Sequence, residues 1–222
     1  RAVCELLKAR LANRPTVDIV CQDILAFDWT RIPRCKVVGA IPYQITSPIL
    51  VSLCEHAQRI SEAWLGIQQE VAQRLAARAG SKAYVRLTIL VQYHFAVTML
   101  AKISKSAFFP LPKVDSAWLH LRAHPTPPVQ IKQPGLLFAL VRAAFAQRRK
   151  TLLNGLRQLA WLRASRSQAE QLIRDSRLPV MVRGEQLSLE EFGRLADVVA
   201  SWQETRNIST LSALTTPYID FG

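Results

Sequence analysis

Apolar residues recur at alternating helical and strand spacings along residues 1–123. Helical spacing is followed by the break Asn13-Arg14-Pro15 and by a β-branched run at 16–20. The pattern predicts helices at 1–12, 48–56, 69–78 and 84–93, and strands at 16–20, 36–39, 63–67, 95–103 and 114–121. The last two strands are expected to pair as an antiparallel hairpin at the sheet edge. Strands that alternate with helices predict an α/β fold, with a mostly parallel sheet covered on both faces.

The second part of the chain has only helical periodicity. The proline-rich segment 124–128 cannot continue a strand and marks the boundary. Helices are predicted at 136–145, 151–161, 168–173 and 188–202, the last opened by the capping box Ser188-Leu189-Glu190-Glu191. We therefore expect domains at 1–123 and 124–206, and a poorly ordered tail at 207–222.

The charge of the chain indicates which class of molecule it binds. Lys and Arg number 29 against 16 Asp and Glu, which gives a formal net charge of +13, and the basic residues concentrate between 122 and 177. Such a bias suits nucleic acid or an acidic membrane surface. The longest apolar stretch, 87–100, is interrupted by Gln92 and His94 and does not predict a membrane span. We expect a cytoplasmic protein, and a monomer.

The four cysteines are Cys4, Cys21, Cys35 and Cys54, with no Cys-x-x-Cys pair. This spacing suggests neither a zinc site nor a redox motif, and no metal is expected. Buried free thiols in a reducing cytosol are the prediction. The first residue is not Met, and residues 1–11 look like a helix already under way rather than a signal peptide, so we expect further sequence upstream.

One strand end carries the clearest chemical motif. Residues 39–49 read Gly-Ala-Ile-Pro-Tyr-Gln-Ile-Thr-Ser-Pro-Ile. This stretch resembles the Asn-Leu/Ile-Pro-Tyr signature of methyltransferases that act on adenine N6, with Ala40 in the place of the asparagine. Taken alone, the segment is better explained as a strand followed by a proline turn.

Longer blocks of sequence favour the methyltransferase. The chain resembles the bacterial small-subunit ribosomal RNA adenine dimethyltransferases in blocks that keep the family's order and spacing, at 69–75, 80–84, 91–93, 106–116, 145–154 and 183–188. The resemblance implies a class I, Rossmann-like domain that uses S-adenosylmethionine and lacks its first strands here, followed by a small all-α domain. It also implies small-subunit ribosomal RNA, in an immature subunit, as the partner.

The resemblance also implies roles for individual residues. The exocyclic amine of adenine is a poor nucleophile, so acceptors that grip its hydrogens assist attack. Ile41 would supply a carbonyl acceptor, Pro42 the rigid turn and Tyr43 a stacking face for a flipped base. Ala40 has no side-chain acceptor, which costs about 1 to 4 kcal/mol at a reacting centre. Phe108 matches a second aromatic on the target base, although a buried hairpin Phe is an equal alternative.

Further residues are assigned to the cofactor and the RNA. Asp23 matches the acidic residue that binds the adenine of S-adenosylmethionine, beside Ala40; an ordinary loop carboxylate is the alternative. The family's glycine-rich loop is expected upstream of the first residue. A phosphate-binding role, or else a merely solvated basic face, is predicted for Lys113, Arg142, Arg148, Arg149, Lys150 and Arg157.

Two other functions remain open. A non-catalytic RNA-binding or ribosome-assembly factor would keep the fold and the basic domain, and Ala40 is the residue that favours it. The antibiotic-resistance methyltransferases of large-subunit RNA and the mitochondrial transcription-factor branch are the nearest alternatives within the fold. The block at 108–116 and the Arg-Arg-Lys-Thr-Leu run at 148–152 favour the small-subunit branch over both.

Overall fold

The computed structural model describes residues 2–206, and the predicted tail at 207–222 lies outside them. The chain separates into two compact units after Pro33. The predicted boundary at 123/124 does not coincide with this division, because the second unit contains both the sheet and the helices after residue 123. It does coincide with the change from strand to helix, and as a domain boundary it stays a prediction.

The first unit is short and contains little regular structure. Its helices are α1 (Ala2–Leu11) and the single 3-10 turns η1 (Ile24–Ala26) and η2 (Trp29–Arg31). The strand predicted at 16–20 is wrong, since the backbone there is irregular. β-branched residues stabilise a strand only when it pairs with a neighbouring strand. Residues 2–33 contain no strand with which this run could pair.

The cysteine prediction is also wrong for two of the four residues. Cys4 and Cys21 form a disulfide within the first unit, with their Cα atoms 6.1 Å apart. Residues 12–20 turn the chain back from α1, so partners 17 residues apart meet, which spacing alone does not reveal. Cys35 and Cys54 are free as predicted, but only Cys54 is buried, and burial raises the pKa of its thiol; Cys35 is half-buried.

A mixed four-stranded sheet forms the centre of the second unit. The strands β1 (Cys35–Ala40), β2 (Ile60–Gln68), β3 (Phe95–Ile103) and β4 (Ser116–Ala123) lie in the order β1-β2-β4-β3. Only β1 and β2 run parallel; β4 is antiparallel to both of its neighbours. The prediction of a mostly parallel sheet is therefore wrong for this unit. The antiparallel edge hairpin is confirmed, because β3 lies at the edge of the sheet and pairs antiparallel with β4.

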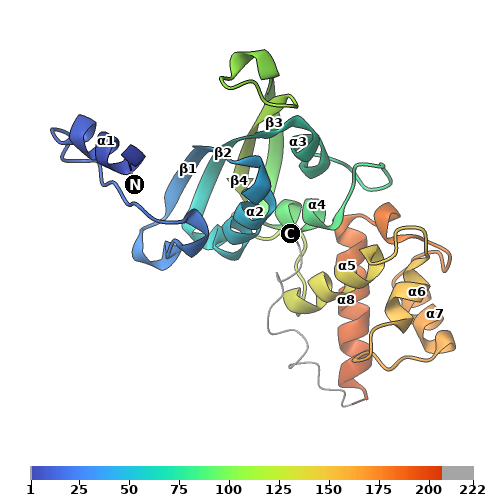
Figure 1. Ribbon diagram of the computed structural model, residues 1–222. Coiled ribbons are helices and arrows are strands. Elements are labelled where there is room, and N and C mark those ends of the chain that lie inside the picture. Colours follow the sequence, from blue (N-terminus) through green and yellow to red (C-terminus); the bar gives the residue numbers. More distant parts are fainter. Residues whose placement is uncertain (1, 207–222) are drawn as a thin grey trace. The chain divides into compact units, whose positions relative to one another are not determined.

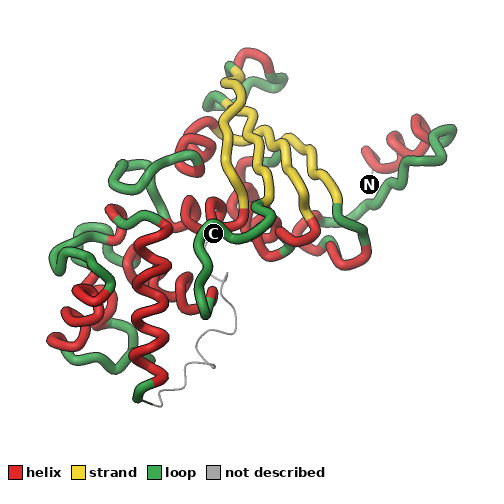
Figure 2. Tube along the Cα trace, turned by 180° about the vertical axis from the view of Figure 1, so that it is seen from behind, coloured by secondary structure: helices red, strands yellow, loops and turns green. Residues whose placement is uncertain are grey.

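Helices cover one face of this sheet. They are α2 (Thr46–Glu55), α3 (Gln69–Leu75) and α4 (Arg86–His94), seen against the strands in Figure 1. The alternating residues Ala63, Leu65 and Ile67 of β2 are buried on that side. The view from behind shows the other face without a helix from residues 34–206 (Figure 2). The prediction that helices cover both faces of the sheet is therefore wrong within this unit.

The helices after residue 123 are α5 (Pro134–Phe145), α6 (Leu152–Arg157), α7 (Arg166–Asp175) and α8 (Leu189–Glu204). The predicted capping box of α8 is confirmed: Ser188 N–H donates to Glu191 Oε2 over 2.8 Å, and Glu191 N–H donates to Ser188 Oγ over 3.2 Å. Buried leucines of α5 and α6 join the two helices. Between residues 2 and 206, no helix combines the length and apolarity needed to cross a bilayer.

Candidate active site

A cavity of about 780 Å³ opens where the strands end, and we call it the strand-end pocket. It lies at the carboxyl end of β1, which is where ligands bind in sheets of this class. Its wall is predominantly apolar and aromatic. The lining residues are Ala40, Ile41, Pro42, Tyr43, Gly66, Ile103, Phe108, Phe109, Pro110, Pro112, Ser116 and Trp118. All five residues predicted as catalytic, Ala40 to Tyr43 and Phe108, therefore meet at one cavity.

Backbone hydrogen bonds hold the predicted motif in place. The Ile41 N–H donates to the Gly66 carbonyl over 2.9 Å, which fixes the peptide just beyond β1. Pro42 then turns the chain, and its carbonyl accepts the Ile45 N–H over 3.1 Å. The hydroxyls of Tyr43 and Ser116 lie 2.7 Å apart, so the Tyr43 ring is tied to β4 across the pocket. This bond gives the proposed stacking ring a defined position.

Three residues in register on neighbouring strands form the floor of the pocket. Ala40 pairs with Gly66, and Gly66 pairs with Trp118. A Cβ atom at Gly66 would stand 2.8 Å from Cζ3 of the Trp118 ring, too close without a shift of that ring. The sequence prediction missed both residues. A lone glycine inside a strand was the available signal, because it often marks close approach of another group.

The β3–β4 connection supplies the outer wall with exposed aromatic side chains. Phe108 is 37% exposed and lines the pocket, so it is not the buried hairpin residue of the alternative interpretation. Phe109 also lines the pocket and is fully exposed. Exposed aromatic rings beside an apolar cavity offer flat surfaces for bases. Phe109 was not predicted.

Asp23 lies in the first unit. Its carboxylate is exposed, and Oδ1 accepts the Leu25 N–H over 2.9 Å as the N-cap of η1. That bond orients one carboxylate oxygen along the local backbone. An exposed, oriented carboxylate is chemically suited to accept from an exocyclic amine, and the cofactor role of Asp23 remains a prediction.

The predicted RNA-binding residues do not form one equivalent set. Arg149, Lys150 and Arg157 are exposed on the helical part, and Lys113 is exposed beside the strand-end pocket. Arg142 is half-buried on α5. The sixth, Arg148, carries two structural bonds: its Nη2 lies 3.1 Å from Glu185 Oε2 and donates to the Lys82 carbonyl over 2.9 Å. Arg148 therefore joins two loops as well as adding charge.

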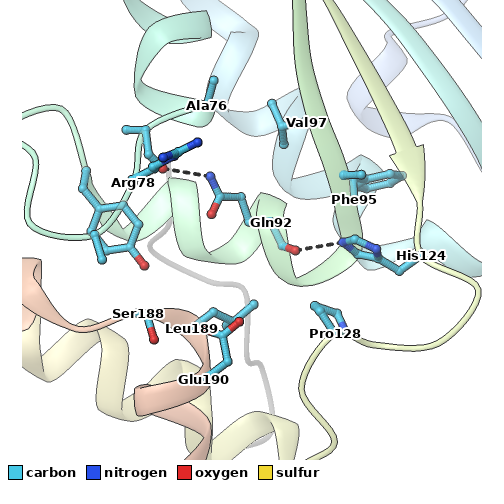
Figure 3. A pocket seen from close by; sticks show the side chains of 14 residues that line it. Ala76, Arg78, Gln92, Phe95, Val97, His124, Pro128, Ser188, Leu189 and Glu190 are labelled. Atoms are coloured by element: carbon cyan, nitrogen blue, oxygen red, sulfur yellow. Dashed lines mark hydrogen bonds between the residues drawn. The ribbon is translucent and has the colours of Figure 1, made fainter.

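A second cavity, of about 630 Å³, lies between the sheet and α8, and we call it the sheet–helix cleft (Figure 3). Three of its polar side chains are used by the fold. Gln92 Nε2 donates to the carbonyls of Leu75 and Ala77 over 2.9 and 3.0 Å. His124 Nε2 lies 3.2 Å from the Gln92 carbonyl oxygen, and Ser188 caps α8. Within residues 2–206, no group of three or more His, Cys, Asp or Glu is placed to hold a metal.

Comparison with known proteins shows to which family the chain belongs. Residues 1–195 match the sequence profile of the family described as ribosomal RNA adenine dimethylase. The chain belongs to this family. A relative named ribosomal RNA small subunit methyltransferase A, from Lachnoclostridium phytofermentans, is 37% identical over 196 residues, which are 85% of this chain and 68% of that protein. The protein of the same name from Syntrophus aciditrophicus is 35% identical over 86% of this chain and 71% of its own length.

Solved structures agree with the family assignment. A dimethyladenosine transferase from Plasmodium falciparum has a TM-score of 0.75 at 23% identity, over 93% of this chain and 80% of that one, and it supports the fold. The 23S rRNA methyltransferase ErmE has a TM-score of 0.64 at 25% identity, over 90% and 78%. The predicted class I methyltransferase fold with a helical region is confirmed. The family match also confirms the predicted resemblance.

Proposed function

We propose that this protein transfers methyl groups from S-adenosylmethionine to N6 of adenine in small-subunit ribosomal RNA. The observation that carries the proposal is the convergence of the Ala40–Tyr43 strand end and Phe108 on one apolar pocket, in a chain of the ribosomal RNA adenine dimethylase family. Relatives named for the small subunit support that substrate over large-subunit RNA. We place the reaction in the cytoplasm, on an immature subunit, with the protein acting as a monomer.

Different pocket residues would hold the base in different ways. A flipped adenine would stack on the Tyr43 and Phe108 rings, which line the same cavity, because base–aromatic stacking needs only flat apolar faces. The Ile41 carbonyl would accept one hydrogen of the exocyclic amine. That acceptor withdraws the amine hydrogens from the ring plane and favours a nitrogen lone pair that points out of it. Apolar walls at Ile103 and Pro112 keep water from competing for the amine.

The residues present fit the cofactor in part. Ala40 borders the pocket at the end of β1, and Asp23 offers an exposed carboxylate for the cofactor's adenine amine. When bound, S-adenosylmethionine supplies an electrophilic methyl group on a sulfonium centre. Ala40 adds no acceptor for the substrate amine, so this chain grips that amine through backbone only.

Basic residues outside the pocket would bind the RNA backbone. Arg149, Lys150 and Arg157 are exposed on the helical part, and Lys113 is exposed beside the pocket. Phosphate contacts of this kind give affinity without sequence preference and weaken as salt rises. The net charge of +13 suits this mode of binding.

Methyl transfer tests the proposal directly. Immature small subunits are incubated with the protein and S-adenosylmethionine labelled on its methyl group, and RNA is digested and separated by base. We expect label on N6-methylated adenine, and less of it with Tyr43→Ala or Phe108→Ala. A Gln58→Ala control, at an exposed position in the turn before β2, should match the unmodified protein. No labelled adenine under any condition contradicts the proposal.

Ala40 supports a second candidate function. With one acceptor missing at the reacting centre, the protein could bind immature subunits as an assembly factor and transfer no methyl group. This candidate requires two results. The protein binds immature subunits with the affinity expected of its basic residues, and no label appears on adenine.

A further inference from the structure

A third cavity, with polar walls, adjoins the strand-end pocket. It has a volume of about 380 Å³ and we call it the polar hollow. The two cavities share the β3–β4 connection: Pro112 lines the pocket and Lys113 the hollow. Gln68 of the hollow pairs with Ser116 of the pocket in neighbouring strands. If one unit of a chain-like ligand binds in one cavity, the adjacent unit therefore lies beside the other cavity.

The side chains that line the hollow are of two kinds. Its acids are engaged: Glu70 pairs with Arg74, and Asp115 Oδ1 accepts the Lys105 N–H over 2.9 Å. Its other polar side chains are three amides and two ammonium groups. Between residues 2 and 206 the structure gives these five side chains no hydrogen bond or ion pair; they are Gln68, Gln69, Gln73, Lys105 and Lys113.

Unpartnered amides and ammonium groups match the two halves of a nucleotide. A glutamine amide donates and accepts at once, which suits the edge of an unpaired base. An ammonium group suits the phosphate that joins two nucleotides. Apolar ligands would leave all five groups desolvated and unpaired, so the hollow does not suit them.

Resting on the proposed function, we infer that the polar hollow binds the nucleotide next to the target adenine in single-stranded RNA. Gln68 and Gln73 contact the edge of its base, and Lys105 and Lys113 contact the linking phosphate. The strand-end pocket then selects the adenine to be methylated, and the hollow selects its neighbour. Sequence preference beside the target follows from the amides rather than from the basic helical part.

The test measures binding of short single-stranded RNAs that carry one adenine. The RNAs are intact, abasic at the adenine, or abasic at the position on either side. With the unmodified protein, we expect removal of the neighbouring base on one side to raise Kd about tenfold, as loss of a base-edge contact does. With the Gln68→Ala/Gln73→Ala variant that penalty should vanish, whereas Gln58→Ala should retain it.

Two outcomes overturn the inference: no penalty on either side with the unmodified protein, or the same penalty in the double variant. The RNA that is abasic at the adenine separates this failure from failure of the proposed function. Its penalty reports the strand-end pocket and should disappear in Phe108→Ala. If that penalty is absent from the unmodified protein, the proposed function itself fails. Thermal unfolding checks both variants, and Gln73→Ala alone, at an exposed helical position, repeats the test with minimal perturbation.

Discussion

The strand-end pocket and the sheet–helix cleft lie at opposite ends of the same hairpin. β3 begins with Phe95 at the cleft and ends with Ile103 at the pocket. Their volumes are similar, about 780 and 630 Å³, but their polar groups have different uses. In the cleft, Gln92 and His124 are bonded to backbone (Figure 3). In the pocket, flat apolar faces are exposed, and the hydroxyl pair of Tyr43 and Ser116 fixes one of them. Cavity size does not separate a binding site from a packing feature; the state of the polar groups does.

The largest effect should come from restoring an acceptor at the pocket. Ala40→Asn adds a side-chain carbonyl beside the substrate amine, and one such bond at a reacting centre is worth about 1 to 4 kcal/mol, or roughly tenfold to a thousandfold in rate. We expect the single-turnover rate of methyl transfer to rise while RNA affinity stays unchanged. Ala40→Leu is the matched control, similar in volume without an acceptor. Equal rates for the Ala40→Asn variant and the unmodified protein would exclude a defect at this position.

The next effect should fall on stability, at the cleft. Gln92→Met removes the amide that donates to two carbonyls while keeping side-chain length. Partly buried carbonyls that lose their donor cost about 1 to 3 kcal/mol. We expect that loss in the free energy of denaturant unfolding, and no change in the affinity for single-stranded RNA. A change in RNA affinity alone would make the cleft a binding site and reverse the comparison.

Acid should destabilise the cleft end of the hairpin through His94. Burial, with His124 nearby, lowers the pKa of His94 to about 4 from its usual 6.5. The unfolded chain then binds this proton first as pH falls, so stability is lost between about pH 6.5 and about pH 4. We expect His94→Phe to reduce this acid sensitivity by about 2 kcal/mol, measured by unfolding across that range. Parallel stability curves for the two proteins would contradict this expectation.

A smaller effect should appear at the pocket's outer wall. Phe109→Ala removes a fully exposed ring, so the unfolding free energy should change little. If the ring stacks on RNA, affinity for single-stranded RNA should fall about tenfold, since one base–aromatic stack is worth about 1 to 3 kcal/mol. Fluorescence anisotropy measures the affinity, and Leu111→Ala, another exposed apolar position of the same loop, is the control. Equal losses for both variants would assign the effect to loop apolarity.

The smallest effect should follow from the hydroxyl pair. Tyr43→Phe keeps the stacking face and removes the bond to Ser116, which is worth about 1 kcal/mol. We expect the rate of methyl transfer to fall severalfold at nearly constant RNA affinity, because the ring remains but its position is less fixed. Ser116→Ala should reproduce the change. A loss confined to stability would place this bond with the packing features.

Much of this arrangement could be predicted from local pattern. The helical and strand periodicities located most elements within a few residues, and the Ala40–Tyr43 strand end located the pocket. The antiparallel pairing of β2 with β4 and the irregular 16–20 run were missed, because pairing depends on partners distant in sequence. Trp118 was missed for the same reason: it reaches the pocket only through its register with Gly66.

The double role of Arg148 affects how loss-of-charge variants are interpreted. Its guanidinium connects residues 82 and 185, so it acts as a tether between loops that belong to different parts of the chain. Neutralising the Arg148-Arg149-Lys150 run as a block removes three charges and also cuts this tether. The resulting loss of RNA affinity would be larger than the loss due to the three charges alone. The dependence of RNA affinity on salt concentration would weaken by less than the removal of three phosphate-binding charges predicts. Single variants at Arg149 and Lys150 report the charge contribution alone.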